Sequence, residues 1–255
     1  MSTRFFTLDA RNADLKDLLE ADPEAGAEFL RRYEMSWYHH ENALDGIVLT
    51  EHELIQALEH QVVGDASMIG VLTTIRNHRA ALERIQAEAK SRKSKLTVAF
   101  LVELYEMLLR DTNPTPKERA IFRREMPLHR TYFHEIAQPG KIEAELEKVV
   151  KFTGTAEFKE FHAIRQAAHV HWAFMQVFPF AEHNGKIGRL LQALYLIRGG
   201  YLQPIIHGSD RNRYYETLRM PPAGLRNFLI EEVENCMENA VRFLRSQRSN
   251  RAASH

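Results

Sequence analysis

Residues 178–189 read FPFAEHNGKIGR, and this stretch decides how the second half of the chain folds. Residues 158–177 precede it with apolar side chains at helical spacing. Phe178-Pro179-Phe180 should end that helix, because a proline disfavours the helical conformation in the residue before it. A second apolar helical pattern starts at Ile187 and ends at Gly199-Gly200, where glycine favours a helix C-terminus. The sequence therefore predicts two helices joined by a short polar loop.

The loop carries the residue types of a phosphate-binding site. The N-terminus of the second helix exposes unpaired N–H groups and the positive end of the helix dipole. Asn184 and Gly185 allow the backbone to turn its amides toward a ligand, with Gly185 free to take a positive φ. Lys186 and Arg189 share a face of the helix, and Glu182 supplies a carboxylate of the kind that binds Mg²⁺ beside phosphate oxygens. An ordinary surface loop with a helix cap is the alternative.

Helical patterns also dominate the rest of the chain. Glycine and proline number only 12 and 9 among 255 residues, which favours helix throughout. Residues 128–136 (LHRTYFHEI) are the one convincing strand-like segment, rich in aromatic and β-branched side chains and followed by Pro139-Gly140. The basic stretch 90–95 is typical of a solvated linker or helix end. The predicted fold class is all-α with one small β-hairpin.

Length and charge set further bounds. The length allows one large domain or two small ones, and we expect a helical region at 1–95, a core at 96–245 and a disordered tail at 246–255. The 34 basic and 34 acidic residues cancel, which argues against a dedicated binder of nucleic acid or of a membrane surface. Cys236 is the single cysteine, so an internal disulfide is excluded. No apolar run could span a bilayer and no secretory signal pattern is present, so we expect a cytoplasmic protein.

Segment 178–189 resembles the signature loop of the Fic family, written His-Pro-Phe-x-(Asp/Glu)-Gly-Asn-(Gly/Lys)-(Arg/Lys)-x-x-Arg. The residues that match in type and spacing are Pro179, Phe180, Glu182, Asn184, Gly185, Lys186 and Arg189. Three more segments are similar to elements of this family. Residues 42–50 resemble its N-terminal inhibitory element, 167–174 the helix before the signature loop, and 210–218 its final segment. The resemblance covers most of the chain and keeps the order of the four elements.

This resemblance implies a Fic-type helical bundle with a small β-hairpin flap. It also implies transfer of a phosphate-containing group, most often AMP from ATP, onto a protein hydroxyl. Glu182 would hold Mg²⁺ between two phosphates, and residues 128–136 would be the flap that docks a protein substrate by β-augmentation. The remaining nucleotide-binding positions of the family are taken by Asn184, Gly185 and Lys186 in the anion hole, Arg189 at the terminal phosphate and Tyr215 near the base.

Four positions depart from the family pattern. Phe178 stands where the family has its catalytic histidine, and a phenyl ring cannot take the proton of an attacking hydroxyl. His183 stands at the first glycine of the motif, where it either crowds the phosphate or supplies a displaced acid or base. Asp45 occupies the position of the inhibitory glutamate, from which it would pair with Arg189. Glu41 replaces the serine or threonine that the family usually has there.

These departures leave three hypotheses. The first is a protein that binds a nucleotide or another phosphate compound with Mg²⁺ but has lost most ordinary AMP transfer. The second is an active transferase with a different acceptor or with His183 as its acid or base. The third is a non-catalytic regulatory or interaction module built on the same fold. Homo-oligomer formation is compatible with all three.

Overall fold

The computed structural model describes residues 3–59, 68–91, 95–112, 115, 118, 121–127 and 135–253. The N-terminal helices are α1 (Thr3–Ala21), α2 (Pro23–Leu44), α3 (Glu51–Leu58), α4 (Ile69–Lys90) and α5 (Val98–Leu109). They are followed by η2 (Pro139–Lys141), α6 (Ile142–Thr153), α7 (Ala156–Glu160), α8 (Ala163–Val177), α9 (Asn184–Arg198), η3 (Gly208–Asp210), α10 (Arg211–Arg219) and α11 (Pro222–Ala253). The all-α prediction is confirmed, and no strand occurs in these ranges. Most of the expected hairpin, 128–134, lies outside the described residues.

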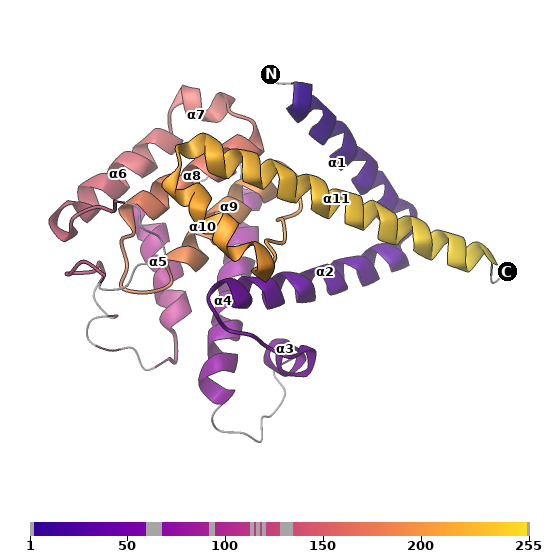
Figure 1. The fold of residues 1–255 in the computed structure, drawn as a ribbon, viewed down its shortest axis with the longest axis horizontal. Helices are drawn as coiled ribbons and strands as arrows, with labels where there is room; N and C mark the ends of the chain where they lie inside the picture. The colour runs from indigo at the N-terminus through magenta and orange to yellow at the C-terminus, as the bar shows by residue number, and fades with distance from the viewer. Residues whose placement is uncertain are drawn as a thin grey trace.

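Helices α8 and α9 form the centre of the molecule, as the pattern around residues 178–189 predicts. α4 packs along α9, and α11 packs against α8. α1 and α2 pack against the C-terminal half of α11 (Figure 1). Gly188 allows α8 and α9 to approach closely, because a Cβ at this position would lie 2.7 Å from Cδ2 of His171 and 3.2 Å from Sδ of Met175. Helices on both sides of the expected boundary at residue 95 contribute to one hydrophobic core.

Helix α2 runs from the edge of the molecule to its middle and ends beside α10 (Figure 1). Its last carbonyl, that of Leu44, accepts hydrogen bonds from Nε of Arg211 and from the hydroxyl of Tyr215, both at 2.8 Å. Gly46 follows with φ 85°, a conformation that glycine adopts without strain. The last turn of α2 is therefore fixed in position next to the start of α9.

The C-terminal tail differs from the prediction. Residues 246–253, expected to be disordered, continue α11 to Ala253. The chain has neither glycine nor proline after Gly224, so nothing in the sequence interrupts the helix once it has started. Within the ranges that the structure covers, no helix is both long and apolar enough to cross a membrane.

Candidate anion-binding site

The loop between α8 and α9 is bounded by two left-handed residues. Phe178 ends α8 with φ 49° and ψ 61°, and its N–H donates to the carbonyl of Phe174 at 2.9 Å. His183 precedes α9 with φ 60° and ψ 9°. Gly185 tolerates a positive φ but does not adopt one, because it already lies in the first turn of α9. The turn falls at the family's first glycine position, which is occupied here by His183.

Asn184 holds the loop closed with its own side chain. Its Oδ1 accepts from the N–H of Phe180 at 3.0 Å, and its Nδ2 donates to the carbonyl of Phe180 at 2.8 Å. The side chain is buried and has both functional groups engaged, so it shapes the loop rather than facing a ligand. The side chain of His183, the N-cap residue, makes no capping hydrogen bond at the start of α9. The first backbone N–H groups of α9 therefore have no acceptor within the helix and can donate to an anion.

Two cations of α9 lie against two carboxylates of α2. Arg189 donates from Nε to Oε2 of Glu41 at 2.6 Å and from Nη2 to Oδ1 of Asp45 at 3.2 Å. Lys186 donates from Nζ to the other oxygen of Asp45. The side chains of Lys186 and Arg189 are each 1% exposed, that of Glu41 is 4% exposed and that of Asp45 is 26% exposed. Two positive and two negative charges therefore meet at the start of α9, and carboxylates occupy the place where an anion would bind.

The pKa values reflect this pairing. Burial disfavours the charge of Asp45, but Arg189 and Lys186 outweigh it and hold the pKa of this carboxyl well below its usual range. Burial dominates at Glu41 and raises the pKa of its carboxyl despite the contact with Arg189. Nη1 of Arg189 is buried and has no hydrogen-bond partner among the described residues. The guanidinium thus retains a donor that neither carboxylate uses.

A second pair of carboxylates lies beside the loop. Glu182 is exposed, and its pKa is raised by partial burial and by the neighbouring carboxylate of Glu118, to which the protonated carboxyl of Glu182 donates a hydrogen bond. Tyr105 places Glu118 there: its ring stacks on Phe180 with centroids 4.2 Å apart, and its hydroxyl donates to the carbonyl of Glu118 at 2.8 Å. Two adjacent carboxylates next to an anion site suit a divalent cation. Sequence reasoning missed Glu118, because nothing in its neighbourhood connects it to the loop.

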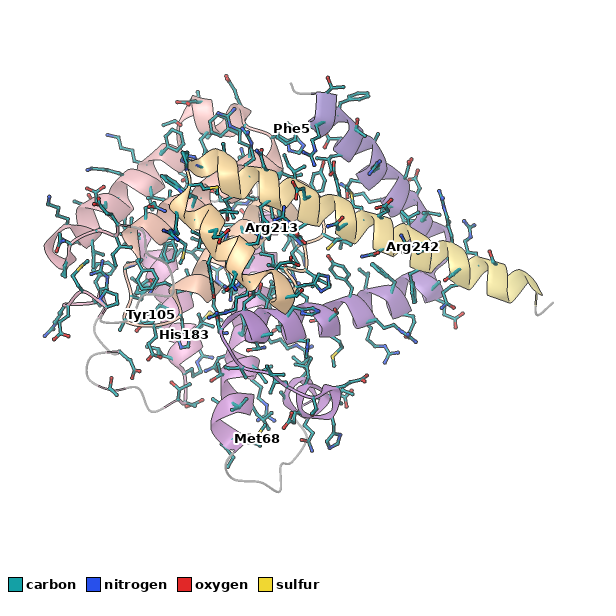
Figure 2. The ribbon with its side chains drawn as sticks, in the orientation of Figure 1. Phe5, Met68, Tyr105, His183, Arg213 and Arg242 are labelled. Atoms are coloured by element: carbon teal, nitrogen blue, oxygen red, sulfur yellow. The ribbon has the colours of Figure 1, made fainter. Side chains whose placement is uncertain are left out.

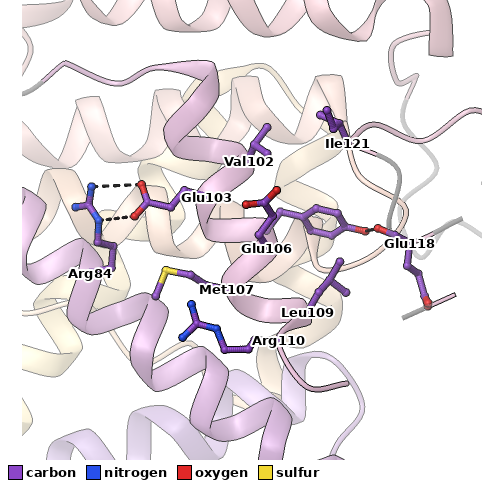
Figure 3. A pocket seen from close by; sticks show the side chains of 10 residues that line it. Arg84, Val102, Glu103, Glu106, Met107, Leu109, Arg110, Glu118 and Ile121 are labelled. Carbon is purple, nitrogen blue, oxygen red and sulfur yellow. Dashed lines mark hydrogen bonds and ion pairs between the residues drawn. The ribbon is translucent and has the colours of Figure 1, made fainter. Parts of the chain in front are cut away.

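Tyr105 and Glu118 also line a cleft of about 560 Å³ along α5 (Figure 3). Apolar side chains, among them Val102 and the largely exposed Ile121, form part of its wall. On the other side of Tyr105 lies His183, with the two ring centroids 6.5 Å apart (Figure 2). Burial and the nearby Lys186 lower the pKa of His183 to about 4, so its imidazole is neutral at pH 7.

Phe178 offers no acid or base to the site, but its backbone is firmly held. Its carbonyl accepts from Nε of Arg123 at 2.7 Å, and the carbonyl of Pro179 accepts from the backbone N–H of Arg123 at 2.9 Å. The same guanidinium also donates to the carbonyl of Ala137. Arg123, which sequence reasoning missed, therefore ties both ends of the expected flap segment to the end of α8.

Tyr215 is fixed by the contact with Leu44 described above, and its side chain is buried. Its neighbour Tyr214 contacts Nε2 of His171 at 2.9 Å, and Nδ1 of His171 contacts Oε1 of Gln192 at 2.8 Å. The segment 210–218 thus positions α2 against the α8–α9 pair. Of the residues singled out in the sequence, Asp45, His183, Lys186 and Arg189 come together at one site, and Glu182 lies at its edge beside Glu118.

Comparisons with known proteins agree with this geometry. Residues 95–196 match the sequence profile described as Fic/DOC family. The chain is 24% identical over 243 residues to "Protein adenylyltransferase Fic" of Drosophila persimilis, covering 93% of this chain and 46% of that protein. It is 25% identical over 244 residues to the protein of the same name in Drosophila willistoni, covering 93% and 47%. The chain spans about half the length of the curated relatives that it matches.

Solved structures show the same fold. A Fic domain containing signaling protein from Bacteroides thetaiotaomicron VPI-5482 superimposes with a TM-score of 0.80 at 20% identity, over 96% of this chain and 97% of that one. Fic-1 (aa134–508) from C. elegans superimposes with a TM-score of 0.72 at 19% identity, over 96% and 74%. Residues 95–196 thus match the Fic/DOC family, and the chain as a whole has the fold of these Fic structures.

Proposed function

We propose that this protein binds a nucleotide or another phosphate compound with Mg²⁺ at the start of α9, and that Asp45 and Glu41 close this site. The observation that carries the proposal is the buried contact of Lys186 and Arg189 with these two carboxylates. Cations that are buried this deeply are costly unless an anion neutralises them. A phosphate group, like the carboxylate that it would replace, is an anion whose oxygens accept paired N–H donors from a guanidinium.

Asp45 is the carboxylate that a phosphate would displace. It is more exposed than Glu41, and it follows the last residue of α2, next to the flexible Gly46. If Asp45 moved away, two hydrogen-bond donors would become available to the ligand, Nζ of Lys186 and Nη2 of Arg189. The unused Nη1 of Arg189 would be a third. Glu41 would stay and keep the guanidinium in its orientation.

The residues present also fit a magnesium ion. Glu182 and Glu118 would hold it beside the phosphates, since Mg²⁺ combines one or two carboxylates with phosphate oxygens and water. Bound there, the ion would neutralise phosphate charge and orient the nucleotide. Glu182 lies immediately before the left-handed turn at His183, so its position is set by the same backbone that aims the N–H groups of α9.

Ordinary AMP transfer should be weak or absent. A positioned general base contributes about 10²–10⁴ in rate, and Phe178 supplies none. A second function has one observation in its favour: His183 is a neutral imidazole at the edge of the site and is able to accept a proton. In that case the protein would be a transferase in which His183 acts as the base, or whose acceptor needs no deprotonation. A protein acceptor would dock on residues 128–136, whose flanks Arg123 fixes beside Phe178.

Two measurements test the closed phosphate site. Calorimetry with ATP and Mg²⁺ should show at least about tenfold tighter binding for Asp45→Asn than for the natural chain, because the competing charge is gone. Asp17→Asn, an equivalent change on the exposed face of α1, should leave the affinity unchanged. Lys186→Met in the Asp45→Asn background should remove the gain. Equal affinities in all four proteins would refute the proposal.

Label transfer from α-labelled ATP in a cell lysate tests the chemistry. We expect label on an acceptor only with the Asp45→Asn/Phe178→His protein, and not when Glu182→Ala is added. Label transfer by the Asp45→Asn protein that disappears with His183→Ala would instead establish the second function. No label in any variant, together with no nucleotide affinity, would leave the non-catalytic module as the explanation.

A further inference from the structure

A second cleft, of about 540 Å³, lies at the far end of α9 from the anion site. It is bounded by the segment before α5, by the end of α6 with α7, and by the last turn of α9. Four of the side chains that line it are cationic, and among its described lining residues none is acidic; the four are Lys95, Lys151, Lys159 and Arg198. We call it the Lys95 cleft.

Three of the four cations that line the Lys95 cleft have no paired carboxylate among the described residues, and the fourth, Arg198, is paired with Glu88. Lys95, Lys151 and Lys159 are exposed and have no ion-pair partner among the described residues. Arg198 has Nη2 3.8 Å from a carboxylate oxygen of Glu88, but Glu88 is shared with Arg84 at 2.7 Å. In a chain with zero net charge, this is a local excess of positive charge inside a concave surface, which concentrates anions.

The floor of the Lys95 cleft is apolar and aromatic. Leu96 and Phe158 are almost fully buried beneath it, and Tyr195 packs edge-on against Phe158 with ring centroids 5.3 Å apart. The volume lies in the range of small-molecule sites, which typically hold about 300–1,000 Å³. Lysine ammonium groups on flexible stems bind phosphates as point charges. The combination suits a small molecule with an apolar or planar part and at least two negative charges.

The position of Lys95 argues against a purely structural role for all of these cations. Lys151, Lys159 and Arg198 lie in the last turns of their helices, where a cation stabilises the negative end of the dipole. Lys95 instead precedes Thr97, the N-cap of α5, where the dipole is positive and a cation is unfavourable. An anion bound in the cleft would offset that repulsion.

We propose that the Lys95 cleft is a second anion site, which takes a small organic phosphate carrying two or more negative charges. α9 separates it from the first site by about 20 Å, given the rise of about 1.5 Å per residue along a helix. This inference does not depend on the function of the first site, because the two sites share no residue.

Lysine footprinting on the natural chain tests the location of binding. With ADP or pyrophosphate present, acylation of Lys151 and Lys159 should slow at least about threefold, whereas acylation of Lys148, which is paired with Glu145 on the same helix, should not change. Lys186→Met should leave this protection intact, which separates it from the first site. Protection that is absent, or equal at Lys148, would overturn the proposal.

Calorimetry tests the charge and the chemistry of the ligand. Lys151→Glu/Lys159→Glu should weaken ADP binding by about tenfold or more, and the control Lys148→Glu should not. ADP should bind more tightly than pyrophosphate, because only ADP can use the aromatic floor. If the double variant loses thermal stability but keeps its ADP affinity, the lysines serve the helix ends and the proposal fails. Tighter binding of pyrophosphate would exclude an organic ligand.

Discussion

Glu41 accepts a hydrogen bond from Nε of Arg189 at 2.6 Å, although the two residues stand 148 positions apart in the chain. Both side chains are almost completely buried, and the contact joins the last turn of α2 to the first turns of α9. Asp45, which directly follows the end of α2, completes the arrangement. The cations at the start of α9 are therefore neutralised by carboxylates from a segment far away in the sequence.

Glu41→Ala should lower the free energy of unfolding by about 3 kcal/mol. It leaves the buried guanidinium of Arg189 with only one carboxylate, that of Asp45, to neutralise its charge. Urea denaturation measures this change. Inorganic phosphate should restore part of the lost stability, since a ligand that binds only the folded state stabilises it. Glu28→Ala removes an exposed carboxylate that pairs with Arg31 and Arg32, and should hardly move the urea midpoint. Equal midpoints for both variants would show that Arg189 has another partner.

His183→Gly and His183→Ala should differ in stability. Both substitutions remove the imidazole, but only glycine adopts φ 60° without steric cost. The alanine variant keeps the left-handed strain, which amounts to about 1–2 kcal/mol per residue, so it should be the less stable of the two by about 1 kcal/mol. Thermal and urea denaturation of the two proteins side by side measure the difference. A more stable alanine variant would mean that the turn relaxes out of the left-handed conformation.

Gly188→Ala should destabilise the α8–α9 contact. Its Cβ would lie 2.7 Å from Cδ2 of His171, which is held by Gln192 and Tyr214 and cannot easily withdraw. Overpacking of a core costs about 1–3 kcal/mol, against a gain of about 1 kcal/mol in helix propensity. Gly70→Ala should show only the gain in helix propensity, because a Cβ at Gly70 would have no atom of the described residues within 4 Å. A stable Gly188→Ala protein would show that the two helices can separate.

The protein should lose stability in acid through His171. Burial is the main reason that the pKa of His171 falls to about 3, well below the value of about 6.5 in an unfolded chain. The fold therefore favours the neutral ring: its contribution is complete above pH 6.5 and is lost as the pH falls toward 3. Between pH 6.5 and pH 5 the expected loss is about 2 kcal/mol.

His171→Gln removes this titration and provides the control. The natural chain should be the more stable protein at pH 7, and its advantage over the variant should shrink as the pH falls to 5. Other buried histidines titrate equally in both proteins and cancel in the difference. A pH-independent difference would contradict the prediction.

The helical parts of the site could be predicted because their cause is local. Apolar spacing, Pro179 and the paired glycines at 199–200 fix where α8 and α9 end, and both ends were expected where they lie. The starts differ: the helix expected from residue 158 is divided into α7 and α8, and α9 begins three residues before the expected Ile187. The residue types in the loop between α8 and α9 also indicated an anion site, because that signal too comes from neighbouring residues in the chain. The conformation inside the loop could not be predicted. Gly185 would adopt a positive φ with less strain than a histidine, yet the left-handed residue is His183. The side chain of Asn184 closes the loop on Phe180 and thereby decides its shape.

By itself, the sequence determined an all-α chain, a polar loop at a helix N-terminus and the cations Lys186 and Arg189 on its first turns. These are consequences of spacing and of the chemistry of single residues. The family resemblance also led us to expect Asp45 beside Arg189, a pair that the structure contains, but only the tertiary structure decided the other contacts of these cations. Glu41 and Asp45 arrive from α2, Glu118 from beyond α5 and Arg123 from the flank of the expected flap. Which distant side chains meet depends on how helices pack around a shared core, and no local pattern encodes that.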